Sequence, residues 1–484
     1  MRRIILLKRN DSLQRAWETR SFAPAVDAAG AGAKVKGFEL EPKVYPIPVF
    51  GRRSDTQALS PHVEYGSRAL QGTPSDVAYA MVGHFDDQDA VERLKSEKGD
   101  NVIGVYADPE ILPAPVYCQA SGEGDYQDVR KALGVTKLRA AGLQGKGVRI
   151  AVMDTGIHGA HPAPDGKPIQ GRIVYGYRPG MAAGSYQGGS SAINHGTMVA
   201  FDSLLGTPAA QILDYAIIPA TGEAWQAFLS DALAAVADLL EYFKKKPGPL
   251  VVNNSWALFD RRDDAPAGSA ENYSANADHP FNQIVGALVD AGADVLFAAG
   301  NCGKECPDGR CGKQDKGRGN SIHGANSHPK VITIAAVTVK KVRLGYSSQG
   351  PGGLNNRKPD LVAFSHFAGS GVYKADGGTS AASPVAAGIV AALRQALPKL
   401  SPGEMKAILQ RTATAVGSAW NYDTGYGIID GYKALQAAKS AKPAKSLQAS
   451  KTAAKKPHEP AWMQQPTTVE ERAAHVMKLR AAAK

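Results

Sequence analysis

Short apolar runs and longer amphipathic segments alternate through the middle of the chain. Six apolar runs have the length and composition of buried strands, at residues 148–153, 212–218, 250–253, 295–299, 331–337 and 360–364. The clearest helical pattern covers residues 223–246, where apolar side chains recur at steps of three and four before Pro247 and Gly248. Strands that alternate with helices imply right-handed crossovers. We therefore expect an α/β fold with a doubly wound, mostly parallel sheet and helices on both faces.

A smaller unit with a different pattern precedes this region. Residues 77–85, 88–98 and 102–107 predict strand, helix and strand, with Asp86 and Asp87 as the helix cap, and they indicate a compact α+β module. The sequence thus divides into an N-terminal segment of unclear fold (1–70), the α+β module (71–112), a linker that contains Pro, Gly and Ser (113–126), the main domain (127–437) and a tail (438–484).

The tail carries most of the positive charge. The chain has 484 residues and a formal net charge of +11, and residues 438–484 contribute ten Lys or Arg against three Asp or Glu, which is +7. Burial of the few apolar residues of the tail cannot offset the loss of conformational entropy on ordering. We therefore expect a largely disordered tail with a short helix near 469–479. We favour this solvated tail over one that binds an anionic surface, and we expect no nucleic-acid partner.

The sequence gives no sign of a membrane or secretory segment. No apolar run approaches the roughly 18 residues that cross a bilayer, and the first residues hold only four apolar side chains between charges. Four cysteines are too few for a disulfide scaffold of this size. We therefore expect a cytoplasmic protein with no membrane partner.

Three segments where a strand or loop meets a helix supply an acid, an imidazole and a hydroxyl. Asp154 ends an apolar strand, whereas His195 and Ser380 each open a helical pattern, and Pro384 falls in the expected first turn of its helix. A serine hydroxyl becomes a nucleophile when an imidazole takes its proton and a carboxylate orients that imidazole. These positions face the crevice at the carboxyl edge of the expected sheet, so they form a candidate triad.

An acyl-transfer site also needs hydrogen-bond donors for the developing oxyanion. Asn301 follows directly after the expected strand 295–299 and offers a side-chain amide at the same edge. The backbone N–H of Ser380 is its expected partner.

Four motifs resemble, in this order, those of the subtilisin-like serine proteases. They are D-T-G-I at Asp154, H-G-T-M-V-A at His195, A-A-G-N ending at Asn301 and G-T-S-A-A-S-P around Ser380. The resemblance spans residues 145–437, and the family that these proteases form is also called peptidase S8. It implies a serine endopeptidase that forms an acyl-enzyme intermediate with peptide or protein substrates. Asp154 is then the orienting carboxylate, His195 the general base and acid, Ser380 the nucleophile and Asn301 the oxyanion donor.

The same resemblance implies a substrate-binding strand and a pocket wall. The strand comprises Ser255, Trp256, Ala257 and Leu258, and the wall comprises Ala298, Ala299 and Gly300. The family usually has glycines after the serine, whereas this chain has Trp256-Ala257-Leu258. The pocket preference of the family therefore does not carry over.

The module at residues 77–107 resembles the inhibitory pro-domain that often precedes this catalytic domain. This resemblance implies a zymogen whose N-terminal region acts as an intramolecular inhibitor and is removed by cleavage between residues 113 and 127. A fused structural domain is the alternative interpretation.

We expect no cofactor and no metal site. The family often has acidic residues where this chain has His158 and Ala163, and residues 197–211 hold no cluster suited to calcium. Cys302, Cys306 and Cys311 follow Asn301 with C-x3-C-x4-C spacing, whereas zinc sites usually contain C-x2-C pairs. We favour a disulfide within this loop, or free thiols, over a metal site. Because three cysteines lie beside Asn301, a further hypothesis is that their redox state is coupled to activity.

Two other functions are compatible with parts of the sequence. A catalytically inactive relative would keep the cleft as a peptide-binding module, but all four chemical positions are filled, which favours an enzyme. A second D-T-G motif at Asp423 makes an aspartic protease another alternative, since two carboxylates share a proton in those enzymes. That fold is nearly all β and leaves His195 and Ser380 unexplained, so we interpret Asp423 as a turn residue.

Overall fold

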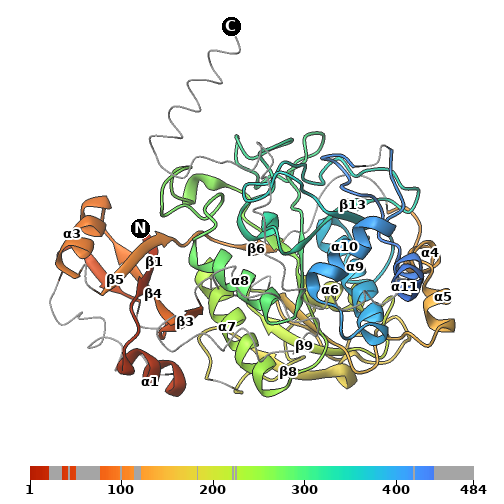
Figure 1. Ribbon diagram of the computed structural model, residues 1–484, viewed down its shortest axis with the longest axis horizontal. Coiled ribbons are helices and arrows are strands. Elements are labelled where there is room, and N and C mark those ends of the chain that lie inside the picture. Colours follow the sequence, from red (N-terminus) through yellow and green to blue (C-terminus); the bar gives the residue numbers. More distant parts are fainter. Residues whose placement is uncertain are drawn as a thin grey trace, which may run out of the picture. The chain divides into compact units, whose positions relative to one another are not determined.

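A parallel sheet forms the centre of the larger part of the molecule in this computed structural model (Figure 1). The structure describes residues 1–20, 35–41, 44–50, 77–98, 101–113, 122–182, 184–220, 223, 226–417 and 420–440, all within the compact unit Met1–Ser440. In this part the sheet has seven strands in the order β14-β13-β12-β10-β7-β9-β8, and all neighbouring pairs are parallel. Their bounds are β7 Arg149–Asp154, β8 Ile173–Tyr177, β9 Gln211–Ala216, β10 Leu250–Asn254, β12 Asp294–Ala298, β13 Ile332–Val337 and β14 Leu361–Phe364.

The doubly wound α/β fold expected from the sequence is present. All strands of this sheet except β8 lie within two residues of a predicted apolar run. The sequence does not predict β8 because residues 173–177 contain two tyrosines and a glycine, which interrupt the apolar pattern.

Helices cover both faces of the sheet. α6 (His195–Ser203) and α9 (Gly378–Ala396) share one buried cluster with Ile150 and Val152 of β7, whereas α7 (Leu229–Lys245) and α8 (Pro280–Asp290) share another with Ala151 and Met153. Successive strand residues point to opposite faces, so β7 is covered from both sides. The remaining described helices are α4 Tyr126–Ala132, α5 Val135–Ala140, α10 Pro402–Thr412 and α11 Gly431–Ser440, with short 3-10 segments at Ile169–Arg172, Arg261–Asp263 and Gly324–Ser327. Within the described ranges, no helix is both long and apolar enough to cross a membrane.

Two helices begin at other residues than the sequence predicts. α7 starts at Leu229 rather than near residue 223, and Asp231 accepts a hydrogen bond from the Phe228 N–H at 2.8 Å, which caps the first turn. α9 starts at Gly378, so Pro384 lies in its second turn and not in the first. Since Pro384 has no N–H to offer, the Ser380 carbonyl one turn earlier accepts a hydrogen bond from the Ser255 hydroxyl at 3.0 Å.

The N-terminal module contains one antiparallel sheet and two described helices. Its described elements are β1 Arg2–Leu7, α1 Asp11–Thr19, β2 Phe38–Leu40, β3 Ile47–Phe50, β4 Val77–Phe85, α3 Gln88–Lys98 and β5 Val102–Ala107. The strand order is β2-β4-β1-β5, and β3 also pairs with β4. β1 lies between β4 and β5, so the first residues of the chain belong to this module and the expected division between residues 70 and 71 is wrong.

The expected linker and tail are only partly described. β6 (Leu112–Pro113) includes the first linker residue, and α11 extends to Ser440, two residues into the expected tail. Residues 114–121 and 441–484, with the helix expected near 469–479, lie outside the described residues.

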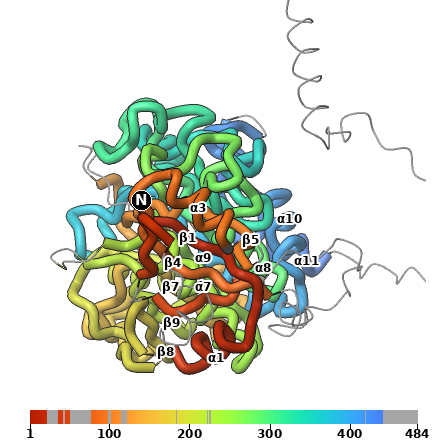
Figure 2. The backbone as a smooth tube through the Cα atoms, turned by 90° about the vertical axis from the view of Figure 1, so that its left-hand side faces the viewer, coloured from red at the N-terminus to blue at the C-terminus, as the bar shows by residue number. Residues whose placement is uncertain are grey.

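The module packs on α7 and α8 (Figure 2). Trp17 donates its indole N–H to Glu241 of α7 at 2.6 Å, and Arg20 forms an ion pair with the same carboxylate at 3.2 Å. At the end of β5, Asp108 accepts hydrogen bonds from the Ser230 N–H and hydroxyl, both at 2.8 Å. The apolar side chains of the module and of both helices form one continuous buried cluster, so the module is part of the folded unit.

The contact between His279 and the module makes stability depend on pH. His279 is fully buried before α8, its Nε2 donates to the Ala107 carbonyl at 2.9 Å, and its Nδ1 accepts from the Phe281 N–H at 3.2 Å. Burial lowers the pKa of His279 to about 4, although the Ala107 carbonyl and the Asp264 carboxylate favour the charged ring. In the unfolded chain the His279 ring takes up a proton near pH 6.5, whereas in the folded protein it stays neutral until about pH 4. The stability that comes from burying the neutral ring is therefore complete above pH 6.5 and is lost as the pH falls toward 4.

We predict that the free energy of unfolding falls by roughly 3 kcal/mol from this group between neutral pH and about pH 4. Urea denaturation at several pH values measures the slope. His279→Gln keeps a polar side chain that does not titrate, so its slope should be smaller in this range. A slope equal to that of the wild type would contradict the assignment.

Candidate active site

Asp154, His195 and Ser380 lie at the carboxyl edge of the central sheet. Asp154 is the last residue of β7, His195 the first residue of α6, and Ser380 the third residue of α9. All three are at most 1% exposed. The parallel sheet thus brings to one edge the residues that the sequence separates by more than two hundred positions.

The carboxylate and the imidazole are in direct contact. His195 Nδ1 lies 2.7 Å from Asp154 Oδ1, which also accepts the Thr155 N–H at 2.8 Å. The side chain of Asn194 accepts the His195 N–H at 2.7 Å and fixes the start of α6. A carboxylate on Nδ1 holds the neutral ring with its proton on that nitrogen, and this leaves Nε2 as the base.

The Ser380 hydroxyl is held next to the expected substrate-binding strand. It donates to the Ser255 carbonyl at 3.0 Å, while His195 Nε2 is buried without a hydrogen-bond partner among the described residues. The hydrogen bond between Ser380 and His195 is therefore not formed in this state. Proton transfer requires the hydroxyl to turn from Ser255 toward the ring, and catalytic hydrogen bonds often align only when substrate is bound.

Asn301 is oriented by the residue that precedes the candidate nucleophile. Its Oδ1 accepts both the N–H and the hydroxyl of Thr379, each at 2.9 Å, and the Thr379 hydroxyl accepts the Gly300 N–H at 3.1 Å. Two donors fix the carboxamide oxygen, so the NH₂ group is turned the other way, which is the orientation that an oxyanion donor needs. Thr379 stands in the same motif as Ser380, but the sequence alone does not mark it as a site residue.

The expected substrate-binding strand is occupied by a segment of the N-terminal region. β11 (Trp256–Ala257) pairs antiparallel with β6, with Trp256 opposite Pro113 and Ala257 opposite Leu112. On the other side, the Ile111 N–H donates to the Ala227 carbonyl at 2.9 Å. Residues 111–113 therefore lie between β11 and the segment at Ala227 and are hydrogen-bonded to both.

The expected pocket wall lies beside this strand and is joined to it by an amide. Ala298 and Ala299 are buried, and Gly300 has a φ of +102°, a conformation that favours glycine. Asn326 donates to the carbonyls of Trp256 and Ala298, both at 2.9 Å, and so ties strand and wall together. No motif marks Asn326, so the sequence analysis did not find it.

The side chains of the strand alternate between the core and the cleft. Trp256 is fully buried against the rings of Phe281 and Phe297. Leu258 belongs to the same core cluster, whereas Ala257 belongs to a small cluster with Cys302 and Cys311. The bulky residues that replace the glycines of the family therefore point away from the substrate side.

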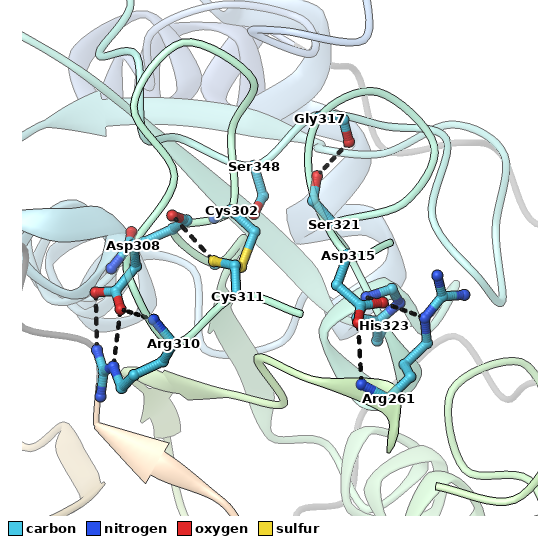
Figure 3. Close-up of a disulfide and its surroundings, with 12 residues drawn as sticks. Arg261, Cys302, Asp308, Arg310, Cys311, Asp315, Gly317, Ser321, His323 and Ser348 are labelled. Carbon is cyan, nitrogen blue, oxygen red and sulfur yellow. Dashed lines mark hydrogen bonds and ion pairs between the residues drawn. A yellow bond between two sulfur atoms is a disulfide. The ribbon is translucent and has the colours of Figure 1, made fainter. Parts of the chain in front are cut away.

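The cysteine loop contains a disulfide, as one of the two interpretations of its spacing predicts. Cys302 and Cys311 are bonded to each other (Figure 3), and Cys306 is also disulfide-bonded. Cys118 lies outside the described residues. In the part of the chain that the structure covers, no group of three or more His, Cys, Asp or Glu side chains is arranged to hold a metal.

Two buried carboxylates lie behind His195. Asp202 follows His195 by two turns of α6, and its pKa is raised well above the usual range by burial and by Asp376. Burial also raises the pKa of Asp376 to about 6, against the Ser370 donors and the charge of His195. Burial and the neighbouring carboxylate both favour the neutral form of Asp202. No motif in the sequence marks this pair.

Comparison with known proteins places the chain in a family. A sequence model of the subtilase family matches residues 145–427. Fervidolysin from Fervidobacterium pennivorans is 26% identical over 336 residues, which cover 63% of this chain and 43% of fervidolysin. Subtilisin amylosacchariticus from Bacillus subtilis subsp. amylosacchariticus is 25% identical over 356 residues, which cover 72% of this chain and 79% of that protein. The chain thus spans less than half the length of fervidolysin.

The solved structure of fervidolysin, a keratinolytic enzyme related to subtilisin, has a similar fold. It aligns with a TM-score of 0.54 and 18% identity over 90% of this chain and 60% of that chain. The fold agrees with the match to the family model, which extends over more than half of the sequence. The chain belongs to the subtilase family.

Proposed function

We propose that the chain is a serine endopeptidase that hydrolyses peptide bonds in peptide or protein substrates. The observation that carries this proposal is the buried contact of 2.7 Å between Asp154 and His195, at the sheet edge that also holds Ser380 and Asn301. Membership of the subtilase family supports the same reaction.

The reaction follows from the positions of four groups. His195 Nε2 takes the Ser380 hydroxyl proton while the oxygen attacks the substrate carbonyl carbon. The Asn301 amide and the Ser380 N–H stabilise the oxyanion, and Asp154 stabilises the charged imidazole. His195 then passes the proton to the leaving amine. Water, activated by the same imidazole, hydrolyses the acyl-enzyme.

The N-terminal module is proposed as an intramolecular inhibitor. A peptide substrate would add as a strand to β11, which residues 112 and 113 already occupy. The contacts of the module with α7 and α8 support its role as a folding partner of the catalytic domain. Maturation would then require cleavage between residues 113 and 127 and release of the module from the cleft.

An inactive peptide-binding protein is the second candidate. The observation that favours it is the hydrogen bond from Ser380 to the Ser255 carbonyl in place of one to His195. A serine-reactive phosphonate discriminates between the two, because an unactivated serine is not labelled. The filled positions at Asp154, His195 and Asn301 favour the enzyme.

The cytoplasmic location expected from the sequence stays a prediction. The small number of cysteines supports a reducing compartment less strongly now, because Cys302, Cys306 and Cys311 are all disulfide-bonded. Disulfides persist mainly in oxidising compartments.

We predict that Ser380→Ala abolishes phosphonate labelling and lowers kcat by about 10⁶, a magnitude established on subtilisin itself. Mass spectrometry of the purified wild type and variant tests maturation in the same preparations. Cleavage between residues 113 and 127 should occur in the wild type alone. Cleavage that persists in the variant would mean that another protease performs it.

We predict that Asn301→Leu lowers kcat by about 10² to 10³ with little change in KM, a range known for loss of the same donor in subtilisin. Thr379→Val removes one of the two groups that orient the amide, so a smaller fall of kcat is expected. Steady-state kinetics of both variants give the comparison. An unchanged kcat in Asn301→Leu would remove Asn301 from the oxyanion site.

We predict that chelation leaves activity unchanged, because positions 158 and 163 carry His158 and Ala163 in place of acidic ligands. Activity before and after incubation with EDTA, with added calcium as the control, measures this. A loss that calcium restores would show that a calcium site is required.

A further inference from the structure

The loop that follows Asn301 is tied to the backbone of that residue. We call residues 302–311 the disulfide loop, since the bond between Cys302 and Cys311 closes it. The Asp308 N–H donates to the Asn301 carbonyl at 2.9 Å, and Cys311 Sγ lies 3.7 Å from the same oxygen. A disulfide sulfur carries no proton, so the second contact is one of packing. The loop thus forms a fixed wall beside the candidate oxyanion site.

Arg310 extends from this loop to the segment that occupies the cleft (Figure 3). Asp308 holds its guanidinium through two hydrogen bonds, from Nε at 2.9 Å and from Nη2 at 3.0 Å. The ring of Phe259 lies under the same group, with Cζ 4.2 Å from the ring centroid. The guanidinium is therefore held in place, and Nη1 donates to the Pro113 carbonyl at 2.6 Å. This acceptor is a backbone atom, which any peptide in the same position would offer.

An apolar surface lies next to this hydrogen bond. Ala257, Phe259, Cys302 and Cys311 form a buried cluster, and Leu112 packs against it. The disulfide is part of the surface that contacts the Leu112 side chain. The four side chains of the cluster are apolar, so this surface suits an aliphatic side chain.

The antiparallel pairing gives the direction of the segment. Leu112 lies opposite Ala257 and Pro113 opposite Trp256, so the segment approaches Ser255 as its residue numbers increase. Ser255 is the residue whose carbonyl binds the Ser380 hydroxyl. Leu112 and Pro113 therefore occupy positions on the acyl side of the bond that Ser380 would attack.

We propose that Arg310 and the disulfide loop are a substrate-binding element on the acyl side. Arg310 donates to the backbone carbonyl at the position of Pro113, and the cluster around the disulfide selects an aliphatic side chain at the position of Leu112. Arg310 binds substrate directly, whereas Asp308 and the disulfide position it. This inference rests on the proposed endopeptidase activity.

The test uses two matched peptides that differ only at the position equivalent to Leu112, one with Leu and one with Asp. Accessible active sites in each preparation are first counted with the phosphonate, so rates refer to reactive enzyme. Arg310→Ala should raise KM for both peptides by about tenfold or more, with kcat within about twofold, because a charge-assisted hydrogen bond to the substrate is lost. Arg310→Lys, which keeps the charge without the planar fork, should recover part of the affinity.

Two further variants separate the element from general effects on folding. Arg262→Ala is the matched control, since Arg262 is 87% exposed and pairs with Asp260, and its KM should be unchanged. Cys302→Ala combined with Cys311→Ala should lower the preference for Leu over Asp by about fivefold or more, because the apolar surface loses its fixed wall. A dithiol reductant converts Cys302 and Cys311 to thiols and is itself oxidised to a disulfide. It should lower the preference for the Leu peptide over the Asp peptide in the wild type and not in the double variant.

The outcomes of this experiment are distinguishable from failure of the proposed function. Absence of phosphonate labelling in the wild type would overturn the endopeptidase proposal itself. Normal labelling with an Arg310→Ala KM within about twofold of the wild type for both peptides would overturn the substrate-binding element. An unchanged Leu preference in the double cysteine variant would remove the disulfide from it.

Discussion

The site depends on the buried contact between Asp154 and His195. A carboxylate with no exposure to solvent is stable as a charge only when donors surround it, and Asp154 has the imidazole and the Thr155 N–H on one oxygen. Because Asp154 ends β7 and His195 begins α6, this contact also fixes the approach of that helix to the sheet. Burial raises the pKa of the nearby carboxyl groups of Asp202 and Asp376, whereas Asp154 contacts the imidazole directly.

The nucleophile is positioned by a second set of contacts, between α9 and the end of β10. The Ser380 hydroxyl donates to the Ser255 carbonyl, and the Ser255 hydroxyl donates to the Ser380 carbonyl. The second bond is available because Pro384 supplies no N–H to that carbonyl within the helix. A helix-breaking residue inside α9 thus helps to tie Ser380, the candidate nucleophile, to the expected substrate-binding strand.

The sequence predicted the sheet and the meeting of four candidate site residues at its edge, because both leave local signals. Apolar runs mark β7 and β12, and short motifs mark Asp154, His195, Ser380 and Asn301. What was missed depends on contacts between distant residues. β1 joins the module only through pairing with β4 and β5, and Arg310 reaches Pro113 across 197 positions of the chain. The direction of the Trp256 side chain likewise follows from the register of β11 and not from its composition.

The most direct test of the account measures what Asp154 does for His195. In Asp154→Asn the side chain keeps its shape, but it no longer stabilises a charged imidazole or enforces the proton on Nδ1. The account predicts that kcat falls by about 10⁴ near neutral pH while KM and the folded structure are preserved. A kcat within about tenfold of the wild type would contradict it, because the buried contact would then be structural and the reaction would not depend on it.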